Sequence, residues 1–78
     1  MADPVSWMMI EHGWAVVDST GASVGRVDEV LGDEHADIFN GLQVLKGAIG
    51  KHAYVAAESV GEIVEGQVQL LMTKDELD

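Results

Sequence analysis

Short apolar runs separated by glycine-containing turns fill most of this chain. Nine glycines and one proline punctuate it, and no segment sustains an apolar stripe at the helical period. Runs rich in β-branched and aromatic residues are typical of strands. The runs expected to form strands are residues 14–18, 23–31, 37–45, 52–55, 62–64 and 67–72. Six short strands joined by tight turns predict a small all-β barrel, closed or nearly closed, rather than a two-layer sandwich.

The run at 23–31 departs from simple alternation. Val24, Val27 and Val30 are three positions apart, a spacing that fits a helix better than a regular strand. The β-branched residues and the flanking glycines nevertheless favour a strand. A β-bulge near Gly25 would reconcile the two signals, and it would help the strand to curve as a closed barrel requires.

The run at 37–45 predicts which side chains share a face of the sheet, because successive side chains of a strand point to opposite sides. One face is expected to carry Ile38, Asn40, Leu42 and Val44, and the other Phe39, Gly41, Gln43 and Leu45.

Two helical turns are also expected. Residues 56–60 include Ala-Ala-Glu, which has low strand propensity. Near the end of the chain, Thr73 is a fair N-cap, and Glu76 stands at the capping-box position three residues later. The barrel is therefore expected to end in a short C-terminal helical turn.

Three segments resemble the PRC-barrel domain family, in order and over roughly residues 10–72. Residues 17–31 contain an Asp-x-x-Gly turn, then the aliphatic-Gly-basic-Val element Val-Gly-Arg-Val, and then an acidic-Val pair. Residues 54–60 resemble the aliphatic-Pro-Ala-Glu-x-aliphatic element of the family, with Ala56 in place of the usual proline. Residues 63–70 resemble its last hairpin.

The resemblance implies a six-stranded PRC-type barrel with a binding role rather than a chemical one. PRC barrels occur in a photosynthetic reaction-centre subunit, in a ribosome maturation factor, and as stand-alone proteins, some of which look like scaffolds in archaeal cell division. We therefore expect a non-catalytic protein-interaction module that scaffolds or regulates a cytoplasmic assembly. The expected organisation is an N-terminal extension at residues 1–9, the barrel at 10–73 and an acidic tail at 74–78.

Size and cysteine content limit how such a domain can be stabilised. Seventy-eight residues form one domain that buries only about 60% of the surface exposed by its unfolded chain. Small domains usually add a disulfide, a metal or a second subunit. Because there is no cysteine, disulfides and thiolate metal sites are excluded. A homodimer is the favoured way to supply the missing burial.

The net charge of the chain indicates which kinds of partner its surface can attract. Fourteen acidic residues stand against four basic ones, for a net charge of −10. Such a surface repels the phosphates of nucleic acids and anionic lipid headgroups, so we expect neither as a partner. A basic protein is the electrostatically favoured partner. No apolar run approaches the length of a membrane span, and the first residues lack the basic region of a signal peptide, so a cytoplasmic location is expected.

An acidic turn offers the alternative function, a small metal- or ligand-binding protein. Asp33, Glu34, His35 and Asp37 combine carboxylates with an imidazole, which suits Zn²⁺ or Mn²⁺. The same residues also suit a solvated turn in an acidic protein, and their spacing matches no calcium loop. We therefore assign no metal and no cofactor, and we keep Asp33, His35 and Asp37 as weak candidates.

Two further histidines, His12 and His52, are candidates for joining that metal site or for acting as a general base. No serine or cysteine stands in a nucleophile motif to partner them. A catalytic set of nucleophile, base and oxyanion donors therefore cannot be assembled from this sequence, and we expect no catalytic activity.

Large apolar side chains outside the expected core suggest an interaction surface. Residues 7–10 read Trp-Met-Met-Ile, and they either cover an open end of the barrel or present Trp and Met to a partner, as interfaces do. Other apolar residues fall on the outward faces of their strands, where joint exposure would mark an interface. The expected interface residues are Trp7, Met8, Met9, Phe39, Leu45 and Leu71.

Overall fold

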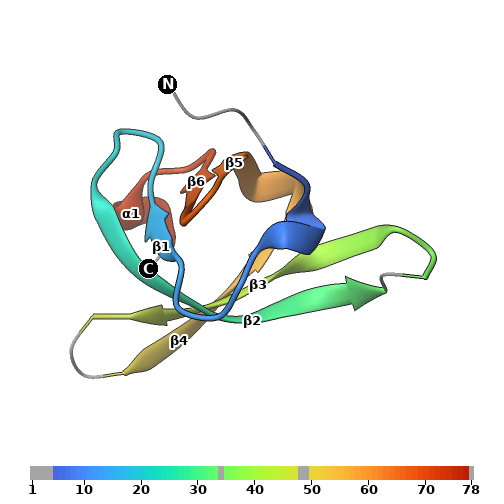
Figure 1. Ribbon diagram of the computed structural model, residues 1–78. Coiled ribbons are helices and arrows are strands. Elements are labelled where there is room, and N and C mark those ends of the chain that lie inside the picture. The colour runs from blue at the N-terminus through green and yellow to red at the C-terminus, as the bar shows by residue number, and fades with distance from the viewer. Residues whose placement is uncertain (1–4, 34, 48–49, 78) are drawn as a thin grey trace.

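The computed structural model describes residues 5–33, 35–47 and 50–77 as one six-stranded all-β domain (Figure 1). Its strands are β1 (Ala15–Val17), β2 (Ser23–Asp33), β3 (Ile38–Lys46), β4 (Lys51–Ala56), β5 (Val60–Val64) and β6 (Gln67–Leu70). Its helical elements are η1 (Trp7–Met9), η2 (Ala57–Ser59) and α1 (Lys74–Leu77). Both the all-β class and the number of strands agree with the expectation from the sequence.

The strands form a single sheet in the order β4-β3-β2-β1-β6-β5. Neighbouring strands are antiparallel, except that β1 and β6 run parallel, with Ala15 opposite Gln67. This parallel pair joins the β2-β3-β4 meander to the β5-β6 hairpin. The sheet curls into a half-barrel, with β4 and β5 as its edge strands (Figure 1).

Irregular pairing in β2 explains its three-residue spacing of valines. Val16 pairs with Gly25 and Val17 pairs with Ser23, so Val24 is left over as a bulge. A second irregularity against β3 leaves Asp28 without a partner. Extra residues in a strand change which side chains face inward and increase its bend. The bulge predicted near Gly25 is thus confirmed.

The face assignment at the start of β3 was wrong, and a bulge is again the reason. Leu31 pairs with Gly41 and Gly32 pairs with Phe39, so Asn40 is the extra residue. Regular alternation is therefore interrupted at Asn40. Phe39 packs against the core, and Ile38, which was assigned to the same face as Leu42, is 51% exposed.

The core lies on the concave side of the curled sheet and is built almost entirely from aliphatic side chains. Partly buried residues pack around it, including both tryptophans. Its buried members are Ile10, Val16, Val24, Val27, Leu42, Val44, Val55, Val68 and Leu70. Because the core side chains are of medium size, each large side chain packed around them contributes a substantial part of the total buried apolar area.

Residues 5–10 bridge two distant parts of the sheet. The backbone N–H of Val5 donates to the carbonyl of Ile63 in β5 at 2.7 Å. Two residues later, Trp7 packs beside Phe39 in β3, and Ile10 is buried in the core. The segment therefore spans the open side of the half-barrel, from an edge strand to the distal end of the β2-β3 hairpin.

The short helical elements also follow the sequence signals. η2 falls within the predicted turn at 56–60. At α1, the Thr73 backbone N–H donates to Glu76 Oε1 at 3.1 Å, and the Glu76 N–H donates to Thr73 Oγ1 at 3.3 Å. These two bonds are the predicted capping box. None of the described helices is long and apolar enough to cross a membrane.

Candidate functional site

Trp7 fixes the N-terminal segment on the sheet. Its indole ring stacks on Phe39, with ring centroids 5.2 Å apart and planes 10° from parallel. Its Nε1 donates to Asp37 Oδ1 at 3.1 Å. The Ser6 hydroxyl caps η1 by accepting from the Met8 N–H at 3.2 Å. Trp7 and Phe39, both expected on an interface, thus contact each other and pack against the core.

The two methionines that follow Trp7 remain exposed. Met8 is 42% and Met9 is 58% exposed, although they lie between the anchored Trp7 and the buried Ile10. The anchors on either side hold the backbone of this pair in place at the surface. Methionine is flexible and polarisable and adapts to varied apolar surfaces, so η1 presents a fixed backbone with adaptable side chains.

The other two expected interface residues lie elsewhere. Leu71 is 65% exposed, just after β6. Leu45 is half-buried on β3. The structure therefore does not gather the six residues into one surface, and η1 carries the largest exposed apolar group among them.

In the acidic turn between β2 and β3, the Asp33 carboxylate accepts hydrogen bonds from the backbone of the turn itself. Asp33 Oδ1 accepts from the N–H groups of His35 and Ala36, at 2.9 and 3.4 Å. Asp37 takes a positive φ of 54° and accepts from the Trp7 indole. Glu34 lies outside the described residues. Among those described, no group of three His, Asp or Glu side chains is arranged to hold a metal ion.

The structure brings His12 and His52 together, on a carboxylate that the sequence analysis did not single out. His12 Nε2 lies 3.7 Å from Asp28 Oδ1, and His52 Nε2 lies 3.3 Å from Asp28 Oδ2. Asp28 is the residue of β2 without a partner in β3, and His52 is on β4. Both imidazoles are mostly exposed. This arrangement links the loop before β1 to β2 and β4 when the imidazoles are protonated.

Asp18 is the one buried charged residue of the described chain, and it organises the turn after β1. Its Oδ1 accepts from Thr20 Oγ1, Thr20 N and Ala22 N, at 2.7, 2.8 and 2.9 Å. Its Oδ2 accepts from the Lys74 N–H at 2.9 Å. The hydrogen bond from the Thr20 hydroxyl, then that from Lys74, lowers the pKa of Asp18 to about 2, against a smaller opposing effect of burial.

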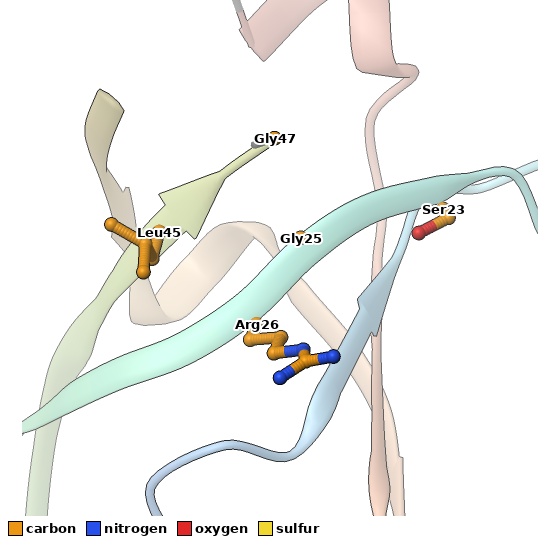
Figure 2. A pocket seen from close by; sticks show the side chains of 5 residues that line it. All are labelled: Ser23, Gly25, Arg26, Leu45 and Gly47. Carbon is orange, nitrogen blue, oxygen red and sulfur yellow. The ribbon is translucent and has the colours of Figure 1, made fainter. Parts of the chain in front are cut away.

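A shallow pocket opens between β2 and the end of β3. It encloses about 400 Å³ and is lined by Ser23, Gly25, Arg26, Leu45 and Gly47 (Figure 2). Arg26 is the only arginine of the chain. Its guanidinium reaches from β2 toward β1, and the Ser23 hydroxyl points to the same side (Figure 2). The pocket thus combines one cation, one hydroxyl, exposed backbone and one leucine.

Sequence reasoning missed three of these residues as site candidates. Asp18 was visible as the first residue of the Asp-x-x-Gly turn, where aspartate side chains commonly bond the backbone two residues on. Arg26 was visible as the single arginine in a very acidic chain. Asp28 had no such signal, because only the sheet brings it between His12 and His52.

Comparison with known proteins gives a family. A search of curated proteins finds no match. Residues 10–78 match the model of a family described as "Uncharacterized protein conserved in bacteria (DUF2171)". This match covers all six strands, η2 and α1, and it begins at the buried Ile10. The chain belongs to the DUF2171 family.

Proposed function

We propose that this chain is a non-catalytic protein–protein interaction module of the PRC-barrel type, which acts as a homodimer in the cytoplasm. The observation that carries the proposal is the pair Met8 and Met9, exposed on a segment that Trp7 and Ile10 hold in place. Trp and Met are enriched at protein interfaces. A preorganised apolar surface binds at a lower entropic cost than a mobile one.

The small core supports self-association. Among the residues that the structure describes, nine buried hydrophobic side chains, most of them valines, form its centre. A chain of this length has a high surface-to-volume ratio, so burial of exposed side chains against a second copy adds a large fraction to its stability. Symmetric pairing of η1 with η1 of a second copy would bury four methionines at once.

The use of the polar groups supports binding over chemistry. The carboxylates of Asp18 and Asp33 hold backbone N–H groups, and the imidazoles of His12 and His52 face one carboxylate. Each of these groups has a structural partner. These polar groups therefore support the fold, and the proposed function depends on the exposed surface of the module.

Light scattering coupled to size exclusion tests the proposal. The expected mass is twice the 8.3 kDa of one chain. The double variant Met8→Gln/Met9→Gln is expected to elute as a folded monomer, with a lower Tm that no longer depends on protein concentration because the dimer no longer stabilises the fold. The matched control is Glu62→Gln/Glu65→Gln, two polar changes at exposed positions of the β5-β6 hairpin, which should leave the dimer intact. A wild-type chain that stays monomeric at millimolar concentration would contradict the proposal.

A further inference from the structure

Arg26 is the only arginine among the four basic residues of the protein. Fourteen acidic side chains compete for four basic ones, so each cation is expected to find a carboxylate. In the part of the chain that the structure describes, no carboxylate lies within ion-pairing distance of the Arg26 guanidinium, which is solvent-exposed. The nearest acidic position along β2 is Asp28, which His12 and His52 face.

The pocket gives Arg26 suitable neighbours for a ligand. The Ser23 hydroxyl lies on the same side of β2 as the guanidinium (Figure 2), and Leu45 from β3 supplies an apolar side chain to the lining. Gly47 adds no side chain, and nothing lies within 4 Å of a Cβ built there, so a ligand can approach the backbone at this position. Arginine presents a planar fork of N–H donors that matches the two oxygens of a carboxylate.

We propose that this pocket binds the carboxylate side chain of an acidic segment in a partner protein. The carboxylate would accept two N–H bonds from Arg26 and one O–H bond from Ser23, while its methylene groups contact Leu45. The inference rests on the proposed function, that the module binds proteins, and it names the chemistry of one partner group. It also qualifies the expectation of a basic partner. The surface of this protein is acidic overall, but the pocket around Arg26 would bind an acidic group of the partner.

Charge and register favour a carboxylate over a phosphate. Arg26 shares its row across the sheet with Leu45 and His52, whereas Lys46 and Lys51 belong to the neighbouring row, whose side chains point to the other face. One cation therefore faces the pocket. A phosphate dianion would meet the repulsion of a protein with net charge −10 at twice the strength felt by a carboxylate.

An NMR titration of the full chain tests the site with defined probes. The acidic probe is N-acetyl-glutamate α-amide, which carries one carboxylate, and the control probe is N-acetyl-glutamine α-amide, its neutral isostere. Ionic strength is held constant with NaCl. We expect saturable shifts of the Gly25 and Gly47 amide signals and of the Arg26 Nε–H with the acidic probe alone. Half-saturation is expected on the order of 10 mM for a single exposed charge-assisted pair.

Variants of Arg26 distinguish specific binding in the pocket from a nonspecific effect of the protein's charge. Arg26→Gln should abolish the saturable shifts, and Arg26→Lys, which keeps the charge without the fork, should weaken binding several-fold. Unchanged titration curves in Arg26→Gln, or no saturable shift in the wild type, would overturn the proposal. Tighter binding of inorganic phosphate than of the acidic probe would overturn the choice of a carboxylate.

The same variants distinguish this proposal from dimer formation. Because Met8 and Met9 lie outside the pocket, Arg26→Gln should leave the mass in light scattering unchanged, and Met8→Gln/Met9→Gln should leave the titration unchanged. If Arg26→Gln halves the mass, the pocket belongs to the contact between two copies and the separate acidic partner is ruled out. If the wild type is monomeric and still binds the acidic probe, the dimer proposal is contradicted and the pocket proposal stands.

Discussion

The Asp18 carboxylate accepts a hydrogen bond from the backbone N–H of Lys74, 56 positions later in the chain. It also holds Thr20 and Ala22, so one side chain ties the turn after β1 to the start of α1. The parallel pairing of β1 with β6 brings these two segments together. A local turn motif therefore fixes a long-range contact between the two ends of the fold.

Replacing Asp18 with Asn should destabilise the protein. In the wild type, backbone N–H groups donate to both oxygens of the Asp18 carboxylate. An asparagine side chain has the same size, but its NH₂ group would face some of these N–H groups, and a buried donor without an acceptor is costly. We expect Tm to fall on the order of 5 °C or more, as befits a domain of this size. Thr20→Val, which removes only the hydroxyl donor, should cause a smaller fall. Equal Tm values for Asp18→Asn and the wild type would contradict this role.

The contribution of Asp18 should also depend on pH. Its pKa in the folded protein is about 2, lowered from the ordinary value of 3.8 by hydrogen bonds. A lowered folded-state pKa means that the ionised carboxylate stabilises the fold above the unfolded value and that this stability is lost as pH falls. The gap in Tm between the wild type and Asp18→Asn should therefore be full above about pH 4, narrow between about pH 4 and pH 2, and change little at lower pH. A gap that stays constant across this range would show that the charge of Asp18 is irrelevant.

Gly25→Ala tests the close approach of β2 and β3. A Cβ built at Gly25 collides with the carbonyl oxygen of Leu45, a backbone atom that has no room to move without breaking the strand pair. We expect a loss of about 2–3 kcal/mol in the free energy of unfolding, measured in urea, as for other overpacked sites. Gly66→Ala is the contrasting variant, because nothing lies within 4 Å of its added Cβ and only its positive φ of 86° opposes the change. A smaller loss at Gly25 than at Gly66 would refute the steric argument.

Trp7→Ala tests whether the N-terminal segment belongs to the folded domain. The indole stacks on Phe39 and packs against the core, so its removal should lower the free energy of unfolding by about 2 kcal/mol, less than for a fully buried tryptophan. Met9→Gln on the same segment should change stability by no more than about 0.5 kcal/mol when measured on the monomer. If Trp7→Ala were as harmless as Met9→Gln, residues 5–10 would be an appendage rather than part of the fold.

The strands were predictable from the sequence, but their pairing was not. Alternation, glycine turns and the three-residue spacing in β2 pointed to six strands and to the bulge beside Gly25, because these signals are local. The parallel pairing of Ala15 with Gln67 joins residues far apart in sequence, and no local pattern specifies it. The same limit applied to the bulge at Asn40, since an alternating run carries no sign of the extra residue until its partner strand is known.

The candidate sites followed the same division. The sequence marked large apolar residues at 7–9 as notable, but only the structure separates the anchored Trp7 from the exposed Met8 and Met9. His12 and His52 were candidates for joining a metal site or for acting as a general base, and the structure places both beside Asp28. Residue type therefore identified the candidates, and tertiary contacts decided which of them act together.

Salt should stabilise this protein. With a net charge of −10, acidic side chains repel one another more in the compact state than in the unfolded chain. The Debye length falls from about 10 Å at 0.1 M salt to about 3 Å at 1 M, so Tm should rise steadily with NaCl at a fixed protein concentration. Glu62→Gln/Glu65→Gln removes two of the ten excess negative charges from exposed positions on the β5-β6 hairpin, and it should raise Tm at low salt and flatten the salt dependence. A Tm that falls with NaCl would mean that attractive pairs, such as those of His12 and His52 with Asp28, outweigh the general repulsion.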